Sequence, residues 1–178
     1  MKHLIIEGCD GTGKSTLINQ LSSTERYVQH SRASTSTGGP VPDLDGWVRN
    51  DLDFLEYKDP LLPFIYDRHP LISELIYADL RTVNRGVSGG FAKLPWIIES
   101  QRRMAKLSVL VICSPSFFSV QKAIEASGKD AHMPGVYDNL HAIYSRYERF
   151  IWPGRVVRYN WHRDSFTDLL QVVDNFND

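Results

Sequence analysis

The stretch EGCDGTGKST at residues 7–16 limits the possible folds more than any other part of the chain. It fits the pattern G-x-x-x-x-G-K-[ST] at residues 8–15, follows the apolar run at residues 3–6 and precedes a helix-like run at residues 17–21. A glycine-rich loop between a strand and a helix points its backbone N–H groups inward, where they and the positive helix end hold phosphate oxygens. The sequence therefore predicts a P-loop that binds a nucleoside triphosphate.

The side chains of this loop have distinct expected roles. Lys14 is expected to reach the β- and γ-phosphates, and the Ser15 hydroxyl is expected to bind Mg²⁺. Cys9 lies near the helix start, where a thiol can be acidified; we favour the simpler interpretation, a small residue in a tolerant position. The residues expected to bind the nucleotide are Gly8, Gly11, Thr12, Gly13, Lys14, Ser15 and Thr16.

Length, charge and cysteine content indicate how many domains to expect and in which compartment the protein lies. The chain has 178 residues, near the usual size of one domain, and we expect a single domain over residues 1–178. Its net charge of −1 argues against a protein that coats nucleic acid, although it is compatible with a local basic site. The two cysteines indicate a reducing compartment, and no apolar run approaches the roughly 20 residues of a membrane span. We therefore expect a cytoplasmic protein without a signal peptide or a membrane partner.

Strand-like and helix-like runs alternate along the chain. Strands separated by helices form a parallel sheet with helices on both faces, so this alternation predicts an α/β fold with five parallel strands. The expected strands are residues 2–7, 27–30, 62–67, 107–113 and 155–159. The expected helices are the one after the P-loop, to about residue 22, and residues 44–57, 70–80, 95–106, 116–126, 136–150 and 165–176.

Asp67 and Arg68 follow the third predicted strand. Ligands of such sheets bind outside the carboxyl ends of the strands, so we expect these residues to face the same crevice as the P-loop. A strand-end carboxylate beside the P-loop strand is where an acid that organises Mg²⁺ lies, and an arginine there can hold two oxygens of a phosphorylated acceptor. In the alternative, structural interpretation, Asp67 caps the next helix and Arg68 pairs with an acid.

Two other classes of P-loop protein fit the sequence less well. A switch GTPase needs D-x-x-G after a strand and a later N-K-x-D, but DLDG at residues 43–46 follows GGPVP and no N-K-x-D occurs. A transporter-type ATPase needs a signature such as L-S-G-G-Q, which VSGGF at residues 87–91 matches only in part. The chain is also short for the helical insertion that carries that signature. We therefore expect neither class.

The stretch EGCDGTGKST resembles the F-E-G-x-D-G-x-G-K-[ST]-T stretch of thymidylate kinases, in which an Asp within the loop, here Asp10, is the distinguishing residue. Asp67-Arg68-His69 resembles the Asp-Arg-Tyr/His motif of that family, Thr37-Gly38-Gly39-Pro40 partly resembles its Glu-Pro-Gly-Gly-Thr loop, and the order of elements matches over essentially the whole chain. The resemblance implies a three-layer P-loop kinase fold, ATP and Mg²⁺ as cofactors, and small-molecule nucleotides as partners.

The same resemblance implies a catalytic set of Lys14, Asp10, Asp67 and Arg68. Asp10 would contact the acceptor sugar or support Arg68, Arg68 would hold the acceptor phosphate, and Asp67 would act on Mg²⁺ through water. Residues 127–135 would take the position of a lid, which excludes water from the reaction. The family also implies a homodimer.

The sequence departs from the family in its acceptor and lid segments. The Arg-Glu-Pro expected before Gly38-Gly39 is missing, and residues 127–135 contain no arginine. Trp47 and Arg49 lie where the family places acceptor-binding groups, although an aromatic at helical spacing such as Trp47 is equally expected in the core. Less favoured candidates are Phe54, Gln101 and Tyr137 for base binding, and Lys122, Arg102 and Arg103 as a replacement for the lid arginine.

These features together predict a nucleoside monophosphate kinase that transfers the γ-phosphoryl group of ATP in line to a deoxynucleoside 5′-monophosphate, dTMP or a related pyrimidine nucleotide. Two alternatives stay open. One keeps the chemistry but uses a nucleoside, a nucleic-acid 5′ end or a modified base in DNA as the acceptor. The other is a regulatory protein that binds ATP without transferring phosphate.

Overall fold

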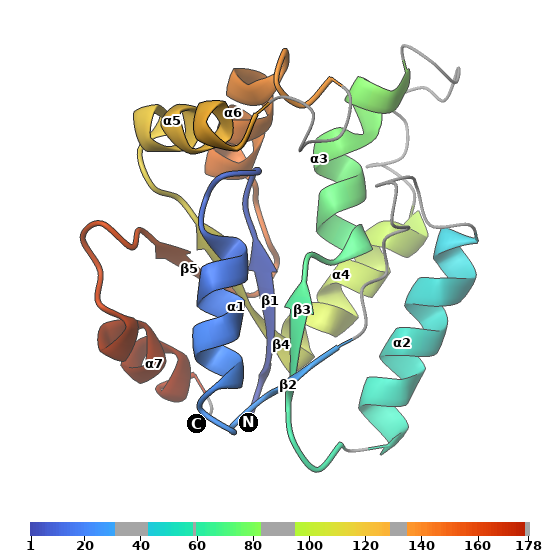
Figure 1. Cartoon of the computed structure of the whole chain (residues 1–178). Coiled ribbons are helices and arrows are strands. Elements are labelled where there is room, and N and C mark those ends of the chain that lie inside the picture. The colour runs from blue at the N-terminus through green and yellow to red at the C-terminus, as the bar shows by residue number, and fades with distance from the viewer. Residues whose placement is uncertain (31–42, 59, 83–94, 129–134, 177–178) are drawn as a thin grey trace.

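A five-stranded, all-parallel sheet of order β2-β3-β1-β4-β5 forms the centre of the protein (Figure 1). The computed structural model describes residues 1–30, 43–58, 60–82, 95–128 and 135–176. The strands are β1 (His3–Glu7), β2 (Val28–Gln29), β3 (Phe64–Asp67), β4 (Ser108–Cys113) and β5 (Arg155–Tyr159). The helices are α1 (Lys14–Ser22), α2 (Leu44–Lys58), α3 (Pro70–Thr82), α4 (Pro95–Leu107), α5 (Phe117–Ser127), α6 (Leu140–Arg149) and α7 (Phe166–Asp174). The predicted α/β fold with five parallel strands is confirmed.

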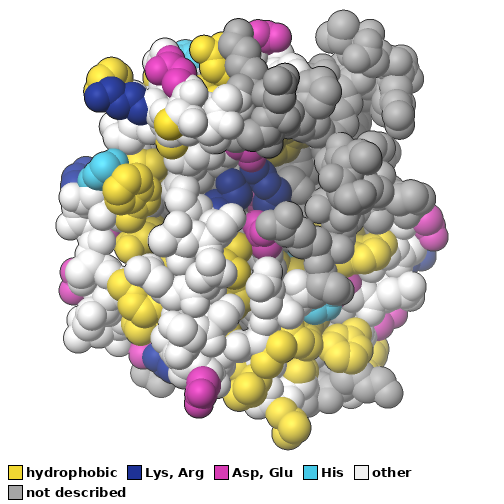
Figure 2. Space-filling model, viewed as in Figure 1, with side chains coloured by type: hydrophobic (Ala, Val, Ile, Leu, Met, Phe, Trp, Pro, Cys, Tyr) yellow, Lys and Arg dark blue, Asp and Glu magenta, His cyan; other side chains and the backbone are white. Residues whose placement is uncertain are grey.

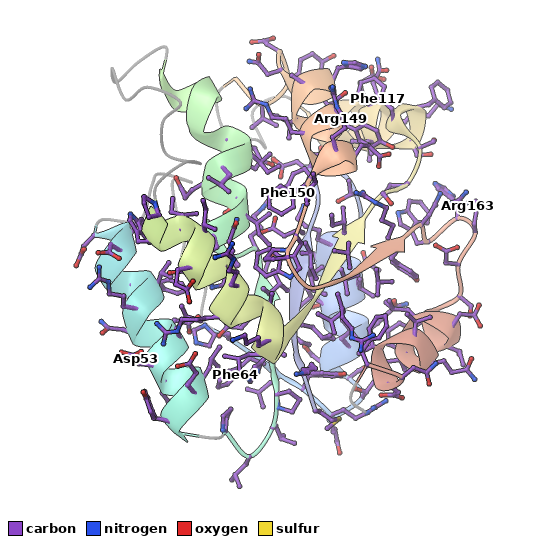
Figure 3. The ribbon with its side chains drawn as sticks, turned by 180° about the vertical axis from the view of Figure 1, so that it is seen from behind. Asp53, Phe64, Phe117, Arg149, Phe150 and Arg163 are labelled. Carbon is purple, nitrogen blue, oxygen red and sulfur yellow. The ribbon has the colours of Figure 1, made fainter. Side chains whose placement is uncertain are left out.

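Helices cover both faces of the sheet, as alternating side chains on the central strands require. Leu4 and Ile6 of β1 pack against apolar residues of α1 and α7 on one face. Ile5, between them, points to the other face and joins the cluster built with α2, α3, α4 and α6. Figure 3 shows this second layer from behind, with α2 and α4 in front of the sheet. The sheet is therefore buried on both sides.

The strand order places the two predicted motifs beside each other. β1 carries the P-loop at its carboxyl end and pairs directly with β3, in a register that sets Ile6 against Asp67. The Arg68 N–H donates to the Ile6 carbonyl at 3.0 Å, so the pairing continues one residue past the end of β3. The P-loop and the Asp67-Arg68 turn consequently lie at one edge of the sheet, as predicted.

Some predicted boundaries move in the structure. The helix expected over residues 136–150 begins at Leu140. Residues 136–139 form turns instead, in which the N–H groups of Asn139 and Leu140 donate to carbonyls three residues back, those of Val136 and Tyr137. The last helix, expected over residues 165–176, is capped by Ser165, whose hydroxyl accepts from the Asp168 N–H. The Gly38-Gly39 motif and most of the lid-like segment predicted over residues 127–135 lie outside the described residues.

Within the described part of the chain, none of the helices combines the length and the apolar character that crossing a membrane requires.

Candidate nucleotide-binding and phosphoryl-transfer site

The P-loop has the backbone conformation that its glycines predict. Gly8, Gly11 and Gly13 have φ angles of 142°, 77° and 85°. At Gly8 a side chain is also sterically excluded: a Cβ there would lie 2.7 Å from Thr12 Oγ1 and 2.8 Å from the Cys113 carbonyl oxygen of β4. The loop thus turns tightly against the neighbouring strand, and glycine permits both the conformation and the close approach.

Helix α1 begins within the P-loop motif. Gly13 is its N-cap, and the Leu17 N–H makes the first intrahelical bond, to the Gly13 carbonyl at 3.1 Å. The amides of Lys14, Ser15 and Thr16 precede that bond and have no acceptor within the helix, so they are available to an anion. Ser15 and Thr16 are exposed. The helix start therefore has the donors that a phosphate site needs.

Lys14 folds back onto the loop. Its Nζ donates to the Cys9 carbonyl at 2.7 Å, and Thr12 Oγ1 donates to the same oxygen at 2.8 Å. Lys14 is buried, and burial together with nearby Arg68 lowers its pKa. A phosphate would offer this ammonium a stronger acceptor than a neutral carbonyl does.

Cys9 has a structural role. It is a buried free cysteine, and burial raises the pKa of its thiol to about 11. Both observations favour the interpretation of Cys9 as a small packing residue over that of an acidified thiol.

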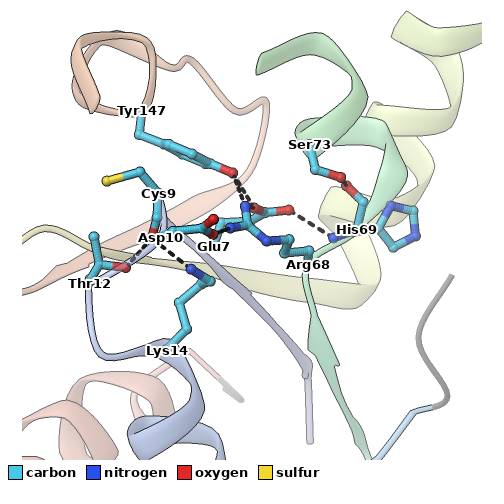
Figure 4. A network of polar contacts seen from close by, with 9 residues as sticks. All are labelled: Glu7, Cys9, Asp10, Thr12, Lys14, Arg68, His69, Ser73 and Tyr147. Atoms are coloured by element: carbon cyan, nitrogen blue, oxygen red, sulfur yellow. Dashed lines mark hydrogen bonds and ion pairs between the residues drawn. The ribbon is translucent and has the colours of Figure 1, made fainter. Parts of the chain in front are cut away.

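Arg68 is the centre of a charged network between the P-loop and the helices behind it (Figure 4). Its Nη2 lies 2.6 Å from Asp10 Oδ1, and its Nη1 donates to the Tyr147 hydroxyl at 2.7 Å. The guanidinium also packs over the Tyr77 ring, 5.1 Å from its centroid. The part of the structural alternative that concerns Arg68 is correct: Arg68 pairs with an acid, and that acid belongs to the P-loop.

Glu7, the last residue of β1, is a second acid of this network and was not predicted. It is fully buried, accepts from the Tyr147 hydroxyl at 2.8 Å and from the His69 N–H at 2.8 Å, and lies 3.8 Å from Arg68 Nη1. Burial raises the pKa of its carboxyl, while Arg68 opposes that shift. The signal for Glu7 was present in the sequence, since it ends the P-loop strand, but its partner Tyr147 is 140 residues away.

Asp67 lies on the opposite face of the sheet from Glu7. Side chains alternate along β3, and Ile65 packs in the cluster with α1, so Asp67 also belongs to the α1 face. The Ser15 hydroxyl lies at the start of α1. The two predicted Mg²⁺ residues therefore share one side of the sheet.

Trp161 extends the site beyond the P-loop. It follows β5 at the same edge of the sheet, and its Nε1 lies 3.1 Å from the position that a Cβ at Gly13 would occupy. The residue is 48% exposed, and its ring lies against that of His162 with centroids 3.6 Å apart. An exposed indole beside a phosphate loop offers a flat surface for a nucleobase. Trp161 was not predicted, although a tryptophan two residues after a predicted strand was a usable signal.

The predicted acceptor residues of α2 have different surroundings. Trp47 packs edge to face on His69, with centroids 5.5 Å apart, and is partly buried against the core. It therefore touches the turn that carries Arg68. Arg49 lies on the exposed side of α2, in an ion pair with Asp45 at 2.7 Å. The described contacts do not link Arg49 to the P-loop or to Arg68, and its role stays a prediction.

The less favoured candidates lie apart from this network in the described contacts. Phe54 stacks on Phe64, and the Gln101 amide donates to the Leu71 carbonyl at 2.9 Å. Arg103 pairs with Glu56 on the surface. Tyr137 is half-buried, Lys122 packs over Phe118, and Arg102 lies 3.8 Å from Glu99.

The whole arrangement is visible as a hollow in the surface. Figure 2 shows basic side chains in the depth of this hollow and acidic side chains at its border. Among the residues that the structure describes, no three His, Cys, Asp or Glu side chains group as a metal site. A Mg²⁺ ion held mainly by phosphates and water needs only one or two protein ligands, so Ser15 and Asp67 fit this ion.

The chain matches no protein-family model and no curated protein sequence. Its structure is similar to that of the YorR protein from Bacillus subtilis in complex with phosphorylated GDP, with a TM-score of 0.66, 16% identity, and coverage of 97% of this chain and 94% of that chain. Deoxyadenosine kinase from M. mycoides with bound dCTP matches with a TM-score of 0.58 and 15% identity over 98% of each chain. Thymidylate kinase from Candida albicans matches with a TM-score of 0.63, 15% identity, and coverage of 99% and 92%.

These similarities extend over nearly the full length of both chains in each comparison, and identities near 15% establish the fold alone. The resemblance to thymidylate kinases found in the sequence motifs is thus confirmed at the level of architecture. The chain has the fold of these three proteins, two of which are kinases by name.

Proposed function

We propose that the protein is a nucleoside monophosphate kinase that transfers the γ-phosphoryl group of ATP to a deoxynucleoside 5′-monophosphate, with dTMP or a related pyrimidine nucleotide as the acceptor. The observation that carries this proposal is the position of Arg68, whose guanidinium lies 2.6 Å from the P-loop acid Asp10. A planar cation beside the phosphate loop suits a second phosphate, which it can bind through two oxygens.

The donor half of the proposal rests on the P-loop. The amides at the start of α1 would bind the phosphates, and Lys14 would exchange the Cys9 carbonyl for the β- and γ-phosphate oxygens. Trp161, exposed beside Gly13, would stack on the donor base. Ser15 and Asp67 would hold Mg²⁺, Asp67 through water, and the ion would supply charge neutralisation on the phosphates.

The acceptor half rests on the Arg68 network. Arg68 would hold the phosphate of the acceptor in line with the donor, and Trp47 would form part of the wall against the base. An acceptor phosphate oxygen then attacks the γ-phosphorus while the bond to the β–γ bridging oxygen breaks and ADP leaves. Because this acceptor oxygen is already anionic, the reaction needs no general base, and the chain contributes position and charge.

A nucleoside acceptor is the second candidate, and one observation favours it. Asp10 and Glu7 lie 2.6 Å and 3.8 Å from the Arg68 guanidinium, so two carboxylates already neutralise this cation without an acceptor phosphate. Deoxyadenosine kinase, one of the proteins with this fold, acts on a nucleoside according to its name.

The deciding experiment incubates the protein with ATP, Mg²⁺ and one acceptor at a time, and detects the product by chromatography. The panel contains each deoxynucleoside monophosphate, modified pyrimidine nucleotides and the matching nucleosides. The proposal expects a diphosphate from one or two pyrimidine monophosphates. Product from a nucleoside alone would favour the second candidate. If none of these acceptors reacts, a DNA 5′ end and DNA with a modified base are tested next. A nucleic-acid acceptor should bind in a way that weakens steeply as the salt concentration rises. ATP binding without product from any acceptor would indicate a regulatory protein.

A matched pair of arginine variants tests the proposed role of Arg68 in binding the acceptor phosphate. Arg68→Gln removes the cation of the network, and Arg102→Gln removes an exposed arginine of α4 whose nearest acid, Glu99, lies at 3.8 Å. We expect Arg68→Gln to lower kcat/KM for the acceptor by about a hundredfold or more, because it removes a charged contact to phosphate. Arg102→Gln should leave kcat/KM unchanged, and equal effects in both variants would contradict the role of Arg68.

A further inference from the structure

Asp51 of α2 is a buried carboxylate that the proposed reaction does not use. Its side chain is 5% exposed, and the Tyr66 hydroxyl lies 3.0 and 3.1 Å from its two oxygens. The Nε2 atoms of His69 and His30 each lie 3.4 Å from one of these oxygens. Asp51 thereby connects α2 to the carboxyl ends of β2 and β3, the same edge of the sheet at which the P-loop lies.

The protonation of His69 follows from its contacts. The Leu71 N–H donates to His69 Nδ1 at 3.1 Å, so Nδ1 is an acceptor and the ring proton is on Nε2, toward Asp51. The backbone N–H of His69 donates in turn to Glu7. His69 is therefore held on its ring side by one buried carboxylate and on its backbone side by another.

Arg68, directly before His69, has a backbone conformation that requires such support. Its φ is 68°, in the left-handed region that residues with a side chain rarely adopt. A conformation of this kind persists where the surrounding contacts determine it. Here the Arg68 N–H donates to Ile6, and the following residue is bound to both Glu7 and Asp51.

Trp47 reaches the same histidine from the other direction. It lies one helical turn before Asp51 on α2, and its ring packs edge to face on His69 and, more distantly, on His30. His69 thus lies between Trp47, our candidate for the acceptor base, and Arg68, our candidate for the acceptor phosphate.

We propose that Asp51 and His69 form a positioning pair that holds Arg68 at a set separation from Trp47, so that the site matches a nucleobase and a 5′-phosphate carried by one molecule. This inference rests on the proposed function. Neither residue of the pair is assigned a contact with substrate. Their effect is on the acceptor alone, since the donor phosphates bind to the backbone of the P-loop and α1.

Asp51→Ala tests the pair, with Asp53→Ala as its matched control. Asp53 is on the same helix (Figure 3), is exposed, and pairs with Arg103 at the surface. We expect Asp51→Ala to raise the KM of the acceptor monophosphate about tenfold, because small displacements of a positioned group weaken its contacts strongly. The KM of ATP should change by less than about twofold, and Asp51→Asn, which keeps one acceptor oxygen, should restore most of the loss.

Calorimetry measures the affinities for the acceptor monophosphate and for its nucleoside. A general loss of structure should not change the ratio of these two affinities. In the unsubstituted protein the monophosphate should bind more tightly than the nucleoside, and in Asp51→Ala this ratio should shrink because Arg68 is displaced. If Asp51→Ala does not fold, His69→Asn replaces it: an Asn oxygen can still accept from the Leu71 N–H, but the shorter side chain cannot reach Asp51.

The outcomes distinguish a failure of the positioning pair from a failure of the proposed function. An unchanged acceptor KM in Asp51→Ala, or equal rises for acceptor and ATP, overturns the positioning pair and leaves the proposed function intact. The positioning pair is also overturned if the ratio of monophosphate affinity to nucleoside affinity is the same in Asp51→Ala as in the unsubstituted protein. If the unsubstituted protein phosphorylates no monophosphate, the proposed function fails and the positioning pair is rejected with it.

Discussion

The two halves of the candidate site are built in different ways. The P-loop half is continuous in sequence, consists mainly of backbone groups and glycines, and contains one buried cation, Lys14. The Arg68 half is assembled from residues of β1, α3 and α6 and from the turn after β3. It consists of charged and polar side chains that contact one another. The first half can therefore be recognised from ten consecutive residues, whereas the second exists only after folding.

This difference predicts different responses to substitution. Removing a P-loop side chain deletes a contact to the ligand and leaves the fold largely intact. Removing a member of the Arg68 network leaves its charged or polar partners buried without compensation, and stability falls.

The largest effect should come from Lys14→Ala, on the P-loop side. We expect transfer to fall by about a thousandfold or more, because the variant loses the cation that neutralises the transferred phosphoryl group. The fold should persist, since Thr12 still donates to the Cys9 carbonyl that Lys14 releases. Steady-state rates together with thermal unfolding check this, and turnover at the normal rate would refute the role of the P-loop.

Glu7→Ala should have the largest effect on stability, on the Arg68 side. The change leaves the Tyr147 hydroxyl and the His69 N–H without their acceptor and Arg68 with one carboxylate fewer. We expect the free energy of unfolding in urea to fall by about 4 kcal/mol. Glu125→Ala, at an exposed glutamate that contacts Gln121, is the control and should have little effect. Similar losses in the two variants would show that the network is not a unit.

Gly8→Ala tests whether the P-loop half also depends on packing. The φ of 142° and the approach to the Cys113 carbonyl leave no room for a methyl group. We expect a loss of about 3 kcal/mol in the free energy of unfolding from strain and crowding. Gly128→Ala separates these causes, because Gly128 has a φ of 80° but, apart from its chain neighbours, no atom of the described residues lies within 4 Å of its Cβ position. This substitution should cost only about 1 kcal/mol. Equal losses would mean that crowding at Gly8 is unimportant.

The smallest effect concerns acid stability on the face of the sheet that carries Glu7. His3 Nδ1 accepts from the Phe64 N–H at 2.9 Å, and burial lowers the pKa of His3 from 6.5 to about 4. A folded-state pKa below the unfolded value gives stability that is present above pH 6.5 and is lost as the pH falls toward 4. The expected loss at pH 5 is about 2 kcal/mol relative to neutral pH.

Urea unfolding at pH 7 and pH 5 measures this loss, and His3→Asn is the matched variant. An Asn oxygen can accept from the Phe64 N–H but does not titrate, so the difference between the two pH values should be smaller by about the same 2 kcal/mol. An unchanged difference would place the acid sensitivity elsewhere in the protein.

Much of the fold followed from local patterns in the sequence. Strand-like apolar runs that alternate with helix-like runs predicted the five strands and the helices between them. The prediction was wrong where a turn competes with a helix. The side-chain amide of Asn139 donates to the Gly135 carbonyl, the N–H groups of Asn139 and Leu140 donate to carbonyls three residues back, and α6 begins only at Leu140. Short-range hydrogen bonding of this kind is a weak signal in a sequence, because Asn is also a common helix cap.

The sequence by itself determined the P-loop, because this loop depends on glycine conformations and on a helix start, which ten neighbouring residues encode. It also placed Asp67 and Arg68 beside that loop, because parallel strands end at a common edge. Only the tertiary structure decided that Arg68 is balanced by Glu7 and Asp10, that Tyr147 joins this network, and that Trp161 lies beside Gly13 and Asp51 beside His69. The physical reason is that buried charges are stabilised by partners distant in the chain, and no local pattern specifies which partners meet.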